Sequence, residues 1–136
     1  MVTEVNIMKF IEKPEGSRNK GHYSPGVIMN NILYVSGQLP LEPATGRVVA
    51  GDVQAQTKCA LQHVEAVLER AGCSKEDVGL CRIYLADISL WDQVNAVYAD
   101  FFGSHMPARV VVPTRTLHFG ALVEIEAMAE LPDENR

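Results

Sequence analysis

One arginine and two glutamates are the residues of this sequence whose types and spacing could do chemistry. Arg109 opens the apolar, β-branched run 107–112, and such a run predicts a buried strand. Residues 123–129 alternate strictly, which places Glu124 and Glu126 on one face of a second predicted strand. A buried guanidinium is always charged, so it must be paired or kept for an anion. A cation on one strand and two carboxylates on another are parts from which a site for a small anionic substrate can be built.

The same residues also have a purely structural interpretation, which the spacing leaves open. Arg109 could simply form a salt bridge with one of the glutamates, because ion-pair networks are common in proteins. Glu126 could be an ion-pair or rim residue, and Trp91 and Tyr98 could be packing residues of a core or an interface. His118 could be a proton shuttle or an inert surface residue.

Length and composition indicate one globular domain. A chain of 136 residues can bury a core without disulfides or metal, and its 47% hydrophobic and 21% charged residues exclude wholesale disorder. The net charge of −5 and the lack of a basic cluster argue against a nucleic-acid binder that relies on phosphate neutralisation.

Cysteine and histidine spacing predicts neither a disulfide framework nor a metal site, and no cofactor is expected. Cys59, Cys73 and Cys81 are an odd number without C-x-x-C spacing, which indicates a reducing compartment. The four histidines lack ligand spacing. The N-terminus resembles no signal peptide and no apolar run approaches about 18 residues, so a soluble cytoplasmic protein is expected.

The elements that must position these side chains follow from turn, cap and periodicity signals. Residues 1–20 are polar and predict an N-terminal arm or loop, and residues 21–136 form a single domain. The predicted elements are strands 27–29 and 32–36 joined by an Asn30-Asn31 turn, a helix from an Asp52 N-cap to Gly72, strand 78–88, a helix from a Ser89–Asp92 capping box to Gly103, and the Arg109 and Glu124 strands. The run 47–49 is a candidate for an additional short strand.

This order predicts an α+β protein with two helices in one layer on one face of a sheet. Each helix has a single apolar stripe, which suits such a layer. Val110 and Val112 face away from Val111, so both sides of the Arg109 strand are apolar. With only two helices to cover the sheet, we expect sister subunits to cover its second face.

Several sequence blocks, in a fixed order, point to a known family. They are residues 34–40 (Tyr-Val-Ser-Gly-Gln-Leu-Pro), 43–46, 52–57, 94–98, 101–102, 107–109 (Pro-Ala-Arg) and 123–127 (Val-Glu-Ile-Glu-Ala). On these blocks the chain resembles the RidA (YjgF/YER057c/UK114) family from about Gly21 to Leu131.

The resemblance implies a chorismate-mutase-like α+β fold, with a mixed sheet and two helices on one face, assembled as a homotrimer with clefts between subunits. It also implies hydrolysis of reactive 2-enamino or 2-imino acids to 2-oxo acids and ammonia. Carried over residue by residue, it implies these roles: Arg109 binds the substrate carboxylate, Glu124 holds the attacking water, and Tyr23, Ser36, Gly37 and Asn95 line or adjoin the cleft.

Departures from the family pattern lie around the two key residues. Val110 and Val111 stand where members often have a small residue and a cysteine, and Leu117-His118-Phe119 replaces the usual Leu-Pro-Lys. These differences bear on the substrate side chain more than on the reaction type. Two other functions stay open: a non-catalytic module that binds or senses 2-oxo acids, and an RNA-directed endoribonuclease or translation inhibitor, which the acidic charge disfavours.

Overall fold

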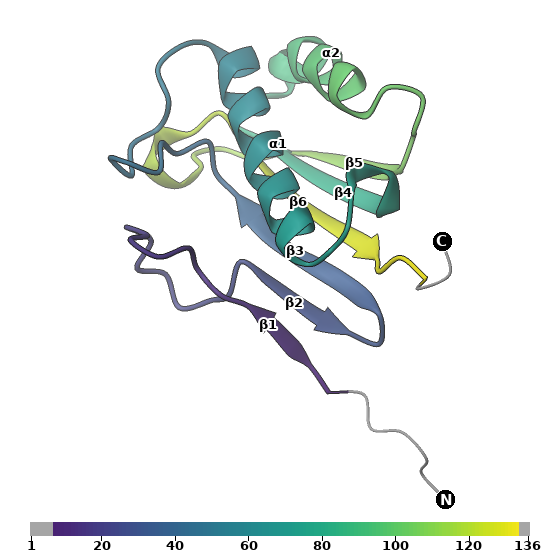
Figure 1. Cartoon of the computed structure of the whole chain (residues 1–136). Helices are drawn as coiled ribbons and strands as arrows, with labels where there is room; N and C mark the ends of the chain where they lie inside the picture. The colour runs from purple at the N-terminus through teal and green to yellow at the C-terminus, as the bar shows by residue number, and fades with distance from the viewer. Residues whose placement is uncertain (1–6, 134–136) are drawn as a thin grey trace, which may run out of the picture.

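Residues 7–133, which the computed structural model describes, form one six-stranded mixed sheet and two α-helices (Figure 1). The strands are β1 (Lys9–Ile11), β2 (Gly26–Met29), β3 (Ile32–Gln38), β4 (Val78–Leu85), β5 (Ala108–Pro113) and β6 (Val123–Glu130), and the helices are α1 (Val53–Arg70) and α2 (Trp91–Phe102). Short 3-10 turns η1 (Lys75–Asp77), η2 (Ile88–Leu90) and η3 (His118–Gly120) complete the order. The strand order is β1-β2-β3-β6-β4-β5, and β4 and β5 are parallel whereas the other neighbours are antiparallel.

Local signals set several element boundaries where the sequence places them. Asn30 and Asn31 both have positive φ, 50° and 64°, as a two-residue hairpin turn requires. The Asp52 carboxylate accepts a hydrogen bond from the Ala55 N–H at 3.0 Å and caps α1. Gly72, with φ of 81°, follows the last turn of that helix. The hairpin turn and both ends of α1 are therefore confirmed.

The start of α2 is a correction. Ser89 lies inside η2, whose N-cap is Asp87: the Asp87 carboxylate accepts from the Ser89 N–H at 2.8 Å. The predicted Ser89–Asp92 capping box is thus wrong, because Asp87 already uses the serine's backbone donor and α2 begins at Trp91 without a side-chain cap. For the same reason β4 ends at Leu85, before the Asp87 turn, and not at residue 88.

Two short pairings involve segments with weak strand signals. Lys9–Ile11, inside the predicted arm or loop, pairs antiparallel with β2 as an edge strand. The candidate strand at 47–49 is reduced to a single bridge between Leu41 and Val48.

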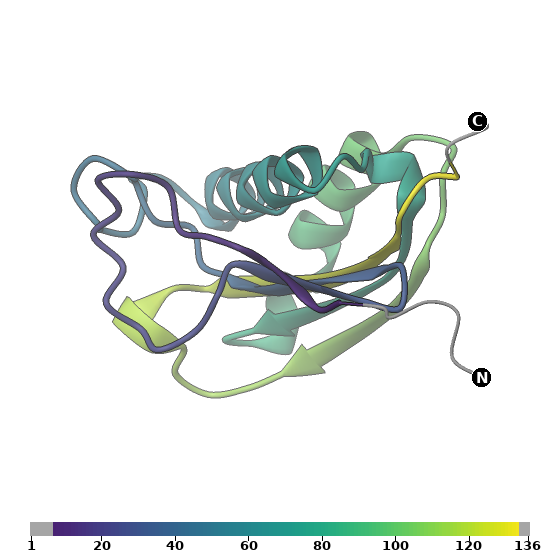
Figure 2. The ribbon, with the colours of Figure 1, turned by 60° about the horizontal axis from the view of Figure 1, so that its bottom comes forward.

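The core lies between the helix layer and one face of the sheet. Figure 2 shows both helices on the same side of the strands, which confirms the predicted single layer. Cys81, Ile83 and Leu85 of β4 alternate inward and are fully buried, as the period of a strand requires. The apolar stripe of α1 packs on the neighbouring strands β3 and β6, and burial of a side chain such as Leu61 stabilises the fold by about 1.5–3 kcal/mol.

The strand that carries Arg109 is not buried in a single chain, contrary to the prediction. β5 is the last strand of the sheet among the described residues, so only one of its edges is paired. Val111 packs on the core, whereas the side chain of Val110, on the other face, is 48% exposed. Tyr34, on the same outer face, is also exposed. Among residues 7–133, none of the helices is long and apolar enough to cross a membrane.

Candidate active site

Arg109 is held by helix α2 and not by a carboxylate. Its Nη1 donates a hydrogen bond to Oδ1 of Asn95 at 2.8 Å. The guanidinium carbon lies 4.8 Å from the ring centre of Tyr98 and 5.4 Å from that of Trp91, both within cation–π range. The side chain therefore points to the helix face of the sheet. The alternative of a salt bridge to Glu124 or Glu126 is wrong within this chain, because both glutamates lie on the opposite face.

This arrangement fixes the guanidinium and leaves it able to bind an anion. The bond to Asn95 uses one of its five N–H donors, and the aromatic rings attract the cation without neutralising it. Tyr98 belongs to the core, as the packing interpretation predicts, while Trp91 stays 36% exposed beside the guanidinium. Beneath them, burial raises the pKa of the Cys81 thiol to about 11, and the Tyr98 hydroxyl and the Arg109 charge offset only part of this.

Glu124 is half-buried against the end of β3. A Cβ at Gly37 would lie 3.0 Å from its Oε2 and 3.1 Å from its carboxyl carbon, so a larger residue at 37 would displace the carboxylate. Burial raises the pKa of Glu124, and the negative charge of Glu126 raises it further, while His118 acts in the opposite direction. The carboxylate is therefore a stronger base than an exposed glutamate.

Glu126 makes the ion pair that the sequence suggests for it. Its Oε1 lies 3.6 Å from Nη1 of Arg82 and accepts a hydrogen bond from the Tyr84 hydroxyl at 2.5 Å. Arg82 and Tyr84 lie beside Glu126 and Glu124 in the register of β4 and β6. Glu126 is thus engaged on both sides, whereas Glu124 faces Gly37.

Tyr23 and Ser36 adjoin the Gly37 end of the sheet. The Ser36 hydroxyl donates to the Ser24 carbonyl at 2.6 Å and ties the end of β3 to the segment before β2. Tyr23 is 47% exposed, its hydroxyl contacts the Asn19 side-chain amide, and Lys13 Nζ lies 5.3 Å from its ring centre. Tyr23 and Gly37 line one cavity, and their predicted roles in a substrate cleft stay predictions.

The predicted site residues fall into two groups on opposite faces of the sheet. The arginine group is Arg109 and Asn95, beside which lie Trp91 and Tyr98, two residues predicted only to pack; the glutamate group is Tyr23, Ser36, Gly37 and Glu124. β5 and β6 are separated by β4, so their backbones lie two strand spacings apart, roughly 10 Å. The sheet itself stands between the two side chains. Arg109 and Glu124 of one chain therefore cannot contact the same small molecule.

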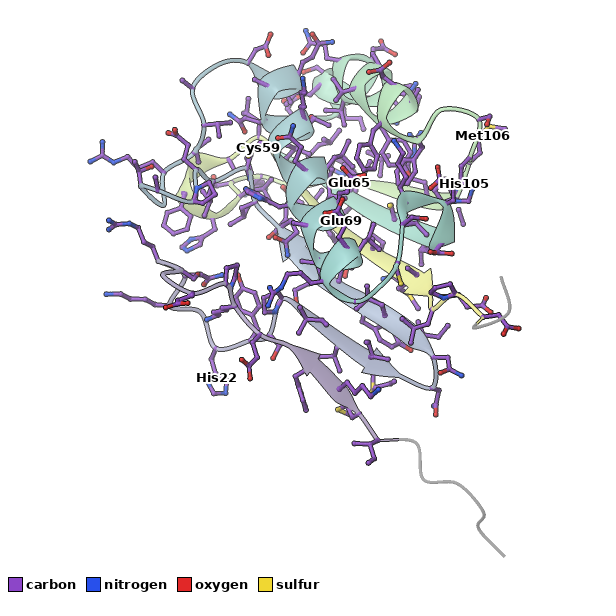
Figure 3. The ribbon with its side chains drawn as sticks, viewed as in Figure 1. His22, Cys59, Glu65, Glu69, His105 and Met106 are labelled. Carbon is purple, nitrogen blue, oxygen red and sulfur yellow. The ribbon has the colours of Figure 1, made fainter. Side chains whose placement is uncertain are left out.

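The structure groups no set of side chains suited to a metal ion within residues 7–133. Figure 3 shows His22 in the segment before β2 and His105 beside Met106 in the loop before β5, on different sides of the molecule. The Sγ atom of Cys59 in α1 lies 3.4 Å from Nε2 of His63. That nitrogen donates its hydrogen to the Leu41 carbonyl at 2.7 Å, so it cannot accept the proton of the thiol. Burial also raises the pKa of the Cys59 thiol, so the pair is not a nucleophile with its base.

The chain matches a known protein family over most of its length. The family model described as endoribonuclease L-PSP matches residues 15–131. The chain belongs to this family, the RidA (YjgF) family.

Relatives in the family match over most of their length. The RutC family protein of Pyrococcus abyssi is 40% identical over 109 residues, which are 80% of this chain and 86% of that protein. The 2-iminobutanoate/2-iminopropanoate deaminase of Bos taurus is 37% identical over 123 residues, 90% of each chain. The crystal structure of E. coli TdcF with bound serine has a TM-score of 0.83 and 33% identity, and covers 91% of this chain and 99% of that one. The α+β fold that the sequence resemblance implies is confirmed.

In this RidA-family chain, the sequence did not predict that the aromatic rings of Trp91 and Tyr98 contact the Arg109 guanidinium. Trp91 and Tyr98 look like packing residues from their types alone. Trp91, Asn95 and Tyr98 are spaced by four and three positions, which places them on one face of a helix. That spacing, read together with the arginine, is the signal that could have grouped them.

Proposed function

We propose that this protein hydrolyses reactive 2-enamino or 2-imino acids to 2-oxo acids and ammonia, in a cleft formed between two copies of the chain. The observation that carries the proposal is the setting of Arg109: an amide and two aromatic rings hold it, and no carboxylate of β6 neutralises it. Such a guanidinium can fork a substrate carboxylate with two parallel hydrogen bonds. Asn95 is then a positioning residue for the fork.

Glu124 supplies the base in this proposal. It takes a proton from a water whose oxygen attacks the imine carbon, and the electrons of the C=N bond move to the nitrogen, which receives that proton from Glu124. The tetrahedral carbinolamine then collapses: Glu124 takes the hydroxyl proton as the C=O bond forms and passes it to the nitrogen, the C–N bond breaks, and ammonia leaves with Glu124 ionised again. The close approach of Gly37 keeps the carboxylate in place, and Tyr23 closes the side of the cleft. Because imines hydrolyse readily, positioning alone accounts for much of the acceleration.

Assembly is part of the same proposal. Since Arg109 and Glu124 of one chain face opposite sides of the sheet, a site that holds both must take Arg109 from one copy and Glu124 from the next. The exposed apolar side chains of Val110 and Tyr34 lie on the sheet face without helices and offer a surface for such contacts. We infer a homotrimer, which has a mass of about 45 kDa because each chain has 15.0 kDa. A monomer in light scattering would contradict the composite cleft.

Relatives support this choice of reaction. The bovine relative is named as a deaminase of 2-iminobutanoate and 2-iminopropanoate, and TdcF was crystallised with serine, a small molecule that carries a carboxylate. A role limited to binding 2-oxo acids would use the same arginine but would not need a base with a raised pKa. An RNA-directed role has the acidic net charge against it. The three cysteines carry no disulfide, which supports the cytoplasmic location that the sequence suggests.

Ammonia release from freshly generated 2-iminobutanoate tests the proposed function. The wild-type protein should accelerate release above the spontaneous rate, and Arg109→Ala should abolish both release and 2-oxo acid binding. Glu124→Gln should keep most of the binding but turn over slowly, because it retains the shape and loses the base. Wild-type protein that binds 2-oxo acid without accelerating release would leave only the binding role. Tight RNA binding that survives about 200 mM salt would favour the RNA-directed role.

A further inference from the structure

The cavity beside the glutamate group is much larger than a short imino acid needs. It has a volume of about 850 Å³ and lies between the segment 13–21, the loop 39–46, helix α1 and η3. Tyr23 and Gly37 line it, and Gly37 is also the residue that the Glu124 carboxylate approaches, although Glu124 itself does not line the cavity. Cavities of this size typically enclose ligands far larger than an alanine-derived imine.

The walls of this cavity are largely apolar. Leu39, Leu41 and Pro43 contribute from one side, and Ala66 and Val67 contribute from α1. A substrate held by its carboxylate must direct its side chain away from the arginine. If a partner copy's Arg109 holds that carboxylate and Glu124 faces the imine carbon, the side chain extends past Gly37 into this cavity. An apolar side chain gains most from these walls.

Phe119 adds an aromatic surface from η3. Its backbone has φ of 60° and Gly120 follows with φ of 71°, a tight left-handed turn that a bulky residue rarely adopts. Phe119 lines the cavity, remains 59% exposed, and its ring centre lies 3.8 Å from that of His118. The fold gains little from an apolar ring in that position. A ligand side chain that packs against the ring would remove it from water.

We infer that this cavity sets the substrate class: 2-imino acids with large apolar or aromatic side chains, which contact Phe119 of η3 and Ala66 of α1. The inference rests on the proposed function for its reaction, and on the cavity for its specificity. Cationic residues also line the cavity (Lys13, Arg18, Lys20 and Arg70), so an acidic side chain is the competing class. Lys13, however, already donates to the carbonyls of Asn19 and Gly21.

Substrates of three kinds separate these classes. An amino-acid oxidase generates the imines of alanine, of leucine or phenylalanine, and of glutamate in situ, and semicarbazide traps whatever the protein has not hydrolysed. The wild type should show a kcat/KM for the leucine or phenylalanine imine about tenfold or more above that for the alanine imine. A preference for the alanine or the glutamate imine would overturn the inference.

Two variants change residues that line the cavity. Ala66→Phe fills the cavity from an exposed helix position, and Phe119→Asn removes the ring while keeping a residue that tolerates positive φ. Each should lower the large-to-small ratio of kcat/KM about tenfold. The matched controls Ala96→Phe, on the solvent face of α2, and Phe10→Asn, on β1, should keep the wild-type ratio. A ratio that stayed unchanged in both wall variants would refute the assignment of this cavity.

Binding of product separates this inference from the proposed function. Calorimetry with 4-methyl-2-oxopentanoate and with pyruvate compares a large and a small 2-oxo acid without any turnover. If no imine is hydrolysed, the deaminase proposal fails, yet tighter binding of the larger acid, lost in Ala66→Phe, still supports the cavity. Equal binding of both acids by the wild type would contradict it.

Discussion

Mixing two impaired variants should restore activity if the site is shared between copies. Arg109→Ala lacks the carboxylate fork and keeps Glu124, whereas Glu124→Gln lacks the base and keeps Arg109. Alone, the Arg109→Ala homo-oligomer should be inactive and the Glu124→Gln homo-oligomer slow, since every cleft then lacks one of the two groups. In a mixed oligomer, a cleft is intact where a Glu124→Gln copy supplies the arginine and an Arg109→Ala copy supplies the glutamate.

The size of the recovery follows from the geometry. Two strand spacings and the thickness of the sheet separate the two side chains of one chain, so no cleft draws both from the same copy. After random exchange of an equal mixture, each partner is the required variant half of the time, and about one quarter of all clefts in a closed ring are intact. The expected activity is therefore about 25% of that of the wild type at equal total chain. A site contained within one chain predicts no recovery.

The assay measures ammonia release from 2-iminobutanoate after the variants have been unfolded together and refolded. A control mixture of wild type with the double variant Arg109→Ala, Glu124→Gln reports on exchange: activity should fall from about one half of the wild type without exchange to about one quarter with it. If that control shows full exchange while the mixture of the two single variants gains no activity over the separate variants, the composite cleft is refuted.

Further predictions concern pH and stability. As a base Glu124 must be ionised, so kcat/KM falls as the pH drops through its raised pKa. Glu126→Gln removes a like charge and should shift this fall in kcat/KM to lower pH. His118→Gln removes the residue that lowers the pKa of Glu124 and should shift it to higher pH. Arg109→Lys should lose most activity in the ammonia assay, because an ammonium cannot reproduce the planar fork. Arg109→Ala should lower the free energy of unfolding in urea by only about 1–2 kcal/mol, since it removes one hydrogen bond and ring contacts; a loss of about 3–5 kcal/mol would indicate a stranded carboxylate. Leu61→Ala, in the fully buried core, should lower it by about 2–5 kcal/mol, and a value below about 1 kcal/mol would contradict the described packing.

Local rules made much of the fold predictable from the sequence. The Asn30-Asn31 turn, the Asp52 cap and the glycine after α1 depend on backbone preferences of a few adjacent residues, and all three are where the sequence puts them. The common face of Glu124 and Glu126 follows from the two-residue period of a strand. The family resemblance named the candidate site residues, and their roles stay predictions for the variants above to test.

Strand order and sheet face were decided only by the tertiary structure. Residues 9–11 form a strand because they pair with the free edge of β2, and no local sequence pattern in the arm predicts this pairing. The Arg109 strand reads as buried from its apolar run, yet it lies at the edge of the sheet because its neighbours depend on pairings between distant segments. The same pairings turn Arg109 toward α2 and Glu124 toward Gly37. The sequence identifies Arg109 and Glu124 as candidate site residues, but only the folded sheet shows that one chain holds them on opposite faces.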